Sequence, residues 1–194
     1  MSNIEAIDKE TNKEKEQIFT SEFLPYANSL YNFAYRLVQS EDDAHDLVQE
    51  TFLKSFKYAL SYEKGTNAKA WLFRILKNTF INEYRKKTKE PIKVDYQKVE
   101  TIYNSEDSEV EATSDLRTET VRDMMGDEIT LALNSLDVDF RTIIILCDLE
   151  DFKYDEMAHI LDIPIGTVRS RLHRARTLLK EKLTGYATKM GYLK

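Results

Sequence analysis

The segment Thr167–Lys182 (TVRSRLHRARTLLKEK) concentrates side chains that bind phosphates and base edges. It holds four arginines, two lysines and one glutamate, in a chain of 194 residues whose formal net charge is −6. Its apolar residues recur at i, i+4, i+7 and i+11, which predicts an amphipathic helix with one buried stripe: Val168, Leu172, Ala175 and Leu179. The arginines then occupy the other faces, where a guanidinium group can pair with the two acceptors of guanine or with phosphate. This pattern predicts a helix that binds duplex DNA.

A shorter helical pattern, residues 154–161, precedes this segment and is separated from it by a break at Asp162–Ile165. Pro164 suits the first turn of the second helix, because its missing N–H would have no partner there. Two helices joined by so short a turn, with arginines on the second, are typical of a helix-turn-helix. Side chains near the start of such a helix face the major groove: Arg169, Ser170, His173 and Arg174. The other bases of the helix are better placed for phosphates: Arg171, Arg176, Lys180 and Lys182. The alternative is a solvated helix end, where cations favour the helix dipole.

The front half of the chain places aromatic residues among basic ones, a combination that favours unpaired bases because aromatic faces stack on them. Helical spacing assigns several of these aromatics to a core instead, among them Trp71 and Phe80. The loop residue Tyr62 and the helix residues Asn78 and Asn82 remain as candidate base contacts. The basic run RKK after them is expected to contact phosphates. The front half is therefore predicted to bind single-stranded nucleic acid and the back half to bind duplex.

Charge is strongly segregated along the chain. Residues 41–50 carry five acids and no Lys or Arg, residues 69–93 eight bases and two acids, residues 95–128 eleven acids and three bases, and residues 169–182 six bases and one acid. The first acidic block follows Ser40, a candidate N-cap with acids in the first helical turn. Acidic side chains repel DNA but suit a basic groove on another protein, and a merely solvated face is the alternative.

Composition limits the class of protein further. With 42% hydrophobic and 32% charged residues, the chain fits a soluble globular protein. No apolar run is long enough to span a membrane and no signal-peptide pattern opens the chain, so a cytoplasmic location is expected. A single cysteine, Cys147, excludes an intramolecular disulfide framework and fits a reducing compartment. Five glycines and three prolines among many helix formers predict an all-α fold.

We expect two small helical domains joined by an acidic, flexible linker. Residues 1–17 are polar and charge-mixed and are expected to form a loose leader, residues 18–91 the first domain and residues 92–126 the linker. Residues 127–187 form the second domain, which ends in the helix-turn-helix, and residues 188–194 are a tail.

Three segments together resemble the extracytoplasmic-function (ECF) group of the sigma-70 family of bacterial transcription initiation factors: DDAHDLVQETFLKSF, GTNAKAWLFRILKNTFINEYRKK and YDEMAHILDIPIGTVRSRLHRARTLLKEKL. The resemblance covers nearly the whole chain apart from the leader and the linker. The middle segment is most similar to the subgroup that controls thiol-oxidative and heat stress, in which a zinc-containing anti-sigma factor holds the sigma factor inactive.

The resemblance implies a sigma region 2, which binds core polymerase and the −10 element, followed by a sigma region 4, which binds the −35 element. Residues implied to dock on the clamp helices of the largest polymerase subunit are Asp43, Asp46, Leu47, Gln49, Glu50 and Phe52. The resemblance implies two contacts with −10 DNA: capture of a flipped base in a pocket lined by Tyr62, and contact along the upstream strand. The residues implied in these contacts are Tyr62, Lys64, Thr66, Asn67, Asn78, Asn82, Arg85 and Lys86. Residues implied to read the −35 duplex are Arg169, Ser170, His173 and Arg174.

The implied partners are core RNA polymerase, −35 duplex and −10 single-stranded promoter DNA, and an anti-sigma factor. A factor of this kind lends promoter specificity to an enzyme and catalyses no covalent step, so no cofactor and no metal site are expected. The sequence departs from the family at two turns: Asp162 stands where glycine is common, and Lys153 where a capping serine is common. Asp tolerates the left-handed conformation, so the first turn is expected to be kept, whereas the helix after Lys153 is expected to fray.

Two other classes of protein compete with this interpretation. A helix-turn-helix regulator of the response-regulator type predicts an α/β domain in front, and the front half shows no alternating strand pattern. An enzyme is suggested only by Glu156 and His159 at i, i+3, half of a di-iron helix motif of which no second copy exists. Cys147 lies in an apolar helical run, which favours a buried, inert thiol over a redox sensor.

Overall fold

The computed structural model describes residues 3–89 and 127–192, with side chains described for residues 10–84 and 128–192. Within these ranges the chain is helical and contains no strand, which confirms the predicted all-α fold. The predicted linker, residues 92–126, lies outside the described residues. We call residues 3–89 the front half and residues 127–192 the back half.

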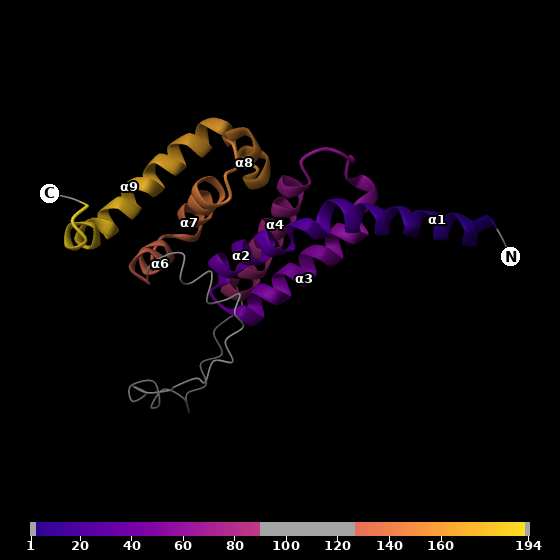
Figure 1. Cartoon of the computed structure of the whole chain (residues 1–194), viewed down its shortest axis with the longest axis horizontal. Coiled ribbons are helices and arrows are strands. Elements are labelled where there is room, and N and C mark those ends of the chain that lie inside the picture. Colours follow the sequence, from indigo (N-terminus) through magenta and orange to yellow (C-terminus); the bar gives the residue numbers. More distant parts are fainter. Residues whose placement is uncertain (1–2, 90–126, 193–194) are drawn as a thin grey trace, which may run out of the picture.

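The front half packs its long helices side by side (Figure 1). Its elements, in order, are α1 (Asn3–Ile18), a π-helical turn (Phe19–Phe23), a 3₁₀ turn (Leu24–Tyr26), α2 (Ala27–Val38), α3 (Glu41–Lys57), a second 3₁₀ turn (Ala59–Ser61) and α4 (Ala68–Lys89). As predicted, Ser40 caps α3, its Oγ accepting a hydrogen bond from the Asp43 backbone N–H at 3.3 Å. Asn67 caps α4 in the same way, its Oδ1 accepting from the Ala70 N–H at 2.9 Å.

The predicted loose leader, residues 1–17, is a helix from Asn3 onward, so that prediction is wrong for this segment. No glycine or proline interrupts residues 3–18, and the helix is anchored at its end, where Ile18 is buried and Phe19 packs on Phe52 with ring centroids 5.3 Å apart. α1 extends beyond the helices of the front half (Figure 1). Packing at one end therefore orders a segment whose composition alone suggested a tail.

The back half contains α6 (Asp127–Asn134), α7 (Val138–Ile144), a π-helical turn (Ile145–Leu149), α8 (Tyr154–Leu161) and α9 (Ile165–Lys189). α8 and α9 form the predicted helix-turn-helix, and Asp162 keeps the turn in the left-handed conformation with φ of 58°. Pro164 lies at the N-cap of α9, one residue before the predicted position in its first turn. At the start of α8, Glu156 accepts a hydrogen bond from the Lys153 backbone N–H at 2.8 Å, which is the half of a capping box that the glutamate at N3 supplies.

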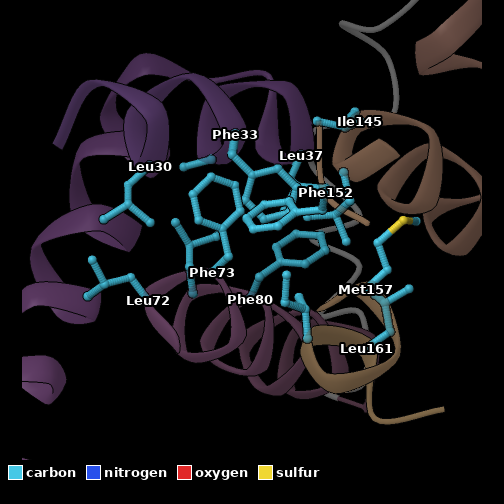
Figure 2. Close-up of a cluster of buried hydrophobic side chains, with 14 of the residues drawn as sticks. Leu30, Phe33, Leu37, Leu72, Phe73, Phe80, Ile145, Phe152, Met157 and Leu161 are labelled. Atoms are coloured by element: carbon cyan, nitrogen blue, oxygen red, sulfur yellow. The ribbon is translucent and has the colours of Figure 1, made fainter. Parts of the chain in front are cut away.

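A continuous cluster of buried hydrophobic side chains joins the two halves. The rings of Phe33 and Phe73 stack with centroids 4.8 Å apart, and Phe73 meets Phe152 of the back half edge to face at 4.9 Å. Figure 2 shows these rings side by side between the helices of the two halves, with Met157 and Leu161 of α8 closing the cluster. The back half is thus packed directly against α4, the helix predicted to meet −10 DNA.

Candidate nucleic-acid interface

The four side chains predicted to read a duplex lie together on the open side of α9. Arg169, Ser170, His173 and Arg174 are all exposed, and within the described residues neither arginine forms an ion pair. Three of the four residues predicted for the opposite stripe are buried, Val168, Leu172 and Ala175 at 0 to 2% exposed, whereas Leu179 is half-buried. We call these four residues the recognition face. Burial of the stripe fixes the rotation of α9, so the recognition face points to solvent.

Two arginines predicted to contact phosphates are held by the back half itself. Arg171 pairs with Asp139 at 3.2 Å, and Arg176 Nε donates to Asp148 at 3.2 Å with a second bond from its Nη2. The hydrogen bonds to Asp148 raise the pKa of Arg176. These pairs tie α9 to α7 and to the turn after it, so both arginines serve the fold of the back half. Lys180 and Lys182 are exposed, and their contact with phosphates remains a prediction.

Tyr62 does not line an open pocket. Its side chain is 5% exposed, with its ring against Phe23 at 5.2 Å and Trp71 at 5.4 Å. Its hydroxyl donates to Glu22 Oε2 at 2.5 Å and lies 3.0 Å from the Thr66 carbonyl oxygen. The predicted role as a base platform is therefore corrected: the loop aromatic belongs to the core, because its ring packs on other aromatic rings and its hydroxyl has oxygen atoms of the protein within hydrogen-bond distance.

The back half covers one side of the predicted −10 surface. Asn67 donates through Nδ2 to Glu156 at 2.5 Å, Lys69 Nζ pairs with Glu150 at 3.0 Å, and Lys77 Nζ donates to the Leu161 carbonyl at 3.1 Å. We call Asn67, Lys69 and Lys77 the covered face. Asn67 is one of the predicted −10 residues, and Lys69 and Lys77 are basic residues of the same loop and helix; the donors of all three have protein acceptors here.

Glu150 is the centre of this contact. Its carboxylate is 8% exposed and lies 3.8 Å from the Arg36 guanidinium as well as 3.0 Å from Lys69. Burial lowers the pKa of Arg36, and the charge of Glu150 opposes that shift. Lys69 also lies over the ring of Phe152, 4.8 Å from its centroid. One acid of the back half therefore neutralises two cations of the front half beside the shared core.

The remaining predicted −10 residues are distributed around the covered face. Lys64 and Thr66 are exposed in the loop before α4, and Asn78 and Asn82 are exposed on α4. The side chains of Arg85 and Lys86, on the last turns of α4, lie outside the described side chains. The joint role of these residues as a −10 surface remains a prediction.

The acidic block forms the exposed side of α3. Asp43, Asp46 and Gln49 are exposed, and Glu50 pairs with Lys54 one turn on, at 3.1 Å. Leu47 is 1% exposed and belongs to the core, so its predicted contact with polymerase is corrected. The reason is its place in the buried stripe of α3. Phe52 is half-buried, with its ring against Phe19.

Sequence reasoning missed three residues of these surfaces. Leu53 is 61% exposed one turn after Gln49, a spacing that could have identified it as an apolar contact on the acidic side of α3. Glu22 and Glu150 contact residues far away in sequence, at separations of 40 and 81 residues, so no local pattern marks them.

Within the described residues, no group of three His, Cys, Asp or Glu side chains is placed to hold a metal ion. Burial raises the pKa of Cys147, with its neighbour Asp148 adding to the shift. A raised pKa disfavours the reactive thiolate and fits the predicted inert thiol. None of the described helices has the length and apolar character to cross a membrane.

Within the described residues these features define a class: an all-helical protein with a helix-turn-helix in its back half and a basic loop-and-helix surface in its front half. The family model described as "Sigma-70 region 2" matches residues 23–90, and the one described as "Sigma-70, region 4" matches residues 126–179. Together these matches cover more than half of the chain. The chain belongs to the sigma-70 family and, by its relatives, to its ECF group of RNA polymerase sigma factors.

Three proteins illustrate the relationship. The ECF RNA polymerase sigma factor SigE of Mycolicibacterium smegmatis is 35% identical over 84% of this chain, which spans 60% of that protein. The sigma factor EcfG of Rhodopseudomonas palustris is 36% identical over 80% of this chain and 79% of its own length. SigW of Bacillus subtilis is 29% identical over 81% of this chain and 84% of its own length.

Two solved structures share the fold. The sigma factor RpoE of Bartonella quintana, solved in complex with the anti-sigma factor NepR, matches with a TM-score of 0.63 at 35% identity, over 86% of this chain and 96% of that one. CnrH, solved with the cytosolic domain of CnrY, matches with a TM-score of 0.62 at 20% identity, over 91% of this chain and 94% of that one, and shows likeness of fold alone.

Proposed function

We propose that this chain directs core RNA polymerase to a set of stress promoters by contacting both promoter elements. The recognition face on α9 reads the −35 duplex, and the loop Ser61–Lys69 with Asn78 captures a base flipped out of the −10 element. Asn82, Arg85 and Lys86 follow the upstream strand. The observation that carries the proposal is the pair of surfaces on one chain, a helix-turn-helix and a basic loop-and-helix surface.

Polymerase docking is assigned to α3. Its exposed acids and amide, Asp43, Asp46 and Gln49, offer negative charge and hydrogen bonds to a basic partner, and Leu53 adds an apolar contact. The clamp helices of the largest polymerase subunit are the proposed partner. Flipping a base costs a few kcal/mol of unstacking, which the binding energy of polymerase and the loop contacts together must offset. In this role the chain binds and positions and forms no covalent bond.

The first test mixes the purified chain with bacterial core RNA polymerase and separates the products by size exclusion. We expect a stable complex that initiates selectively on a genomic promoter library, which would also give the −10 and −35 sequences. Absence of a complex, with duplex binding intact, would instead indicate a simple helix-turn-helix regulator.

The contact between the two halves supports a second part of the proposal: the free chain is closed and binds promoter DNA weakly. Glu150, Glu156 and the Leu161 carbonyl accept from donors of the covered face, where DNA would otherwise bind. Polymerase must separate the halves before the −10 strand can enter. Gel shift without polymerase tests this, since nanomolar binding of promoter DNA by the free chain would contradict it.

We also propose an anti-sigma factor as the regulator. Support comes from the Bartonella quintana relative, which was solved with such a partner. The similarity of residues 65–87 to the thiol-oxidative and heat-stress subgroup favours a zinc-containing partner. Affinity purification of the chain from its host, followed by metal analysis of the co-purified protein, tests both statements: a partner without zinc would move the chain to another subgroup.

A further inference from the structure

Two acidic residues of the N-terminal segment tie down the loop between α3 and α4. Glu22, in the π-helical turn, accepts through Oε2 from the Tyr62 hydroxyl at 2.5 Å and from the Gly65 N–H at 3.3 Å. Glu14 of α1 pairs with Lys64 at 2.9 Å. The loop is therefore attached at three positions to a segment that precedes it by about forty residues or more.

The two groups that donate hydrogen bonds to Glu22 are held in fixed positions. The Tyr62 ring is buried between Phe23 and Trp71, so its hydroxyl is held in one place. Burial raises the pKa of Tyr62, and the hydrogen bond to Glu22 raises it further, which keeps the hydroxyl a donor at neutral pH. Gly65 has φ of 78°, a left-handed conformation that favours glycine, and its N–H is directed at the same carboxylate.

Electrostatics alone does not explain why Glu22 lies next to a loop that is proposed to contact DNA. A carboxylate beneath a loop that meets DNA repels the phosphates, so its presence lowers affinity unless it contributes through geometry. The residues that follow in the loop are Thr66 and Asn67, which are exposed, and in the closed chain the Asn67 amide is held by Glu156 of the back half. Their positions follow from the two residues that Glu22 holds, one of them immediately before Thr66.

We propose that Glu22 is a positioning residue for base capture, holding the loop Ser61–Lys69 through Tyr62 and Gly65 in the shape that presents Thr66 and Asn67 to an unpaired base. This inference rests on the proposed function of the loop. The match to sigma region 2 begins at residue 23, so Glu22 and Glu14 both lie before it. The N-terminal segment then completes the −10 surface of this chain.

The proposed role predicts a change in DNA affinity opposite in sign to the one that charge predicts. Glu22→Ala removes a negative charge near DNA and should strengthen binding if charge alone matters. If Glu22 preorganises the loop, the same change weakens binding of a single-stranded −10 oligonucleotide by about tenfold, because the loop must be ordered at the moment of binding. Glu16→Ala is the matched control: it removes the same charge from an exposed position on α1, and among the described residues the Glu16 carboxylate forms no hydrogen bond or ion pair.

The experiment uses holoenzyme reconstituted from the full chain and core polymerase, with the −10 sequence obtained from the promoter library. Fluorescence anisotropy compares an intact −10 oligonucleotide with one that is abasic at the captured position. We expect wild type, Glu16→Ala and Glu22→Gln, which keeps an acceptor, to discriminate between the two. Glu22→Ala should lose most of this discrimination, and Tyr62→Phe should lose part of it. The double variant, which combines both changes, should lose no more discrimination than Glu22→Ala alone.

Three outcomes would overturn the inference. Discrimination by Glu22→Ala equal to wild type would remove the positioning role, and additive losses in the double variant would show that Glu22 and Tyr62 act separately. Failure of wild-type holoenzyme to discriminate would overturn the proposed capture function itself, and the inference with it. Affinity for core polymerase serves as the check on folding, and if Glu22→Ala loses it, Tyr62→Phe and Glu22→Gln carry the same comparison.

Discussion

The recognition face of α9 and the covered face beside α4 differ in what lies over them. The four side chains of the recognition face are exposed, whereas Asn67, Lys69 and Lys77 each have an acceptor from the back half. Both surfaces carry donors suited to nucleic acid. Under the proposed function, the difference means that closure acts on one promoter element: −10 contact would require the halves to separate, and −35 contact would not.

The hydrophobic contact and the ion pairs at the covered face contribute to closure in different ways. Phe73 and Phe152 bury apolar surface and exclude water. This contact favours closure but does not determine how the two halves are oriented. Glu150 with Arg36 and Lys69 fixes which surfaces meet, since a buried charge without its partner is strongly unfavourable. The hydrophobic contact thus holds the two halves together, and the ion pairs of Glu150 determine which surfaces of the halves meet.

The largest expected effect comes from the hydrophobic part of this contact. Phe152→Ala removes a ring that is 5% exposed, and such truncations cost about 3–4 kcal/mol. We expect the closed form to open, seen as a larger radius of gyration in small-angle X-ray scattering with helicity retained by circular dichroism. Tyr192→Ala, at an aromatic that is 75% exposed, should leave the scattering unchanged. A compact Phe152→Ala chain would show that the rings do not hold the halves together.

The ion pair gives the next largest effect. Glu150→Gln leaves Arg36 and Lys69 without their counter-charge and should destabilise closure by about 2 kcal/mol, less than a fully buried pair because Lys69 is 25% exposed. Binding of single-stranded −10 DNA by the free chain should increase in parallel. Asp139→Asn breaks an ion pair within the back half and serves as the control. Equal DNA binding by both variants would argue against a specific role for Glu150.

Arg174→Ala tests the other surface. We expect a loss of about 1–3 kcal/mol at one base pair of the −35 element, with affinity for core polymerase and the radius of gyration unchanged. Arg176→Ala is the matched control, because its guanidinium is committed to Asp148 and should not read a base. A loss that is uniform over all −35 sequences would identify Arg174 as a phosphate contact. The measurement is a competition assay with single-substitution duplexes.

The smallest expected effect concerns the turn between α8 and α9. Asp162 has φ of 58°, and Asp162→Ala should lower the free energy of unfolding by about 1 kcal/mol, since alanine adopts this conformation less readily. Asp162→Gly should change it little. Urea unfolding of the two variants measures the difference. Equal stability of both would mean that the left-handed turn is not strained.

Local features of the sequence predicted much of this molecule. The spacing of Val168, Leu172 and Ala175 predicted both the helix and its buried stripe, because helical period and burial are linked by geometry. The Ser40 cap is likewise a local interaction between residues three apart. The same local view was wrong for α1, whose order comes from packing at Ile18, and for Tyr62, whose burial depends on Phe23 and Trp71.

The sequence by itself determined the helices that follow α1, the Ser40 cap, the helix-turn-helix and the identity of the side chains on α9. These depend on residues within a few turns of one another. Only the tertiary structure decided that Glu150 and Glu156 cover the residues beside α4, and that Glu22 holds the loop, since these contacts join positions 40 to 89 residues apart. Such pairs leave no periodic signal, because they arise only when packed helices bring distant side chains to the same place.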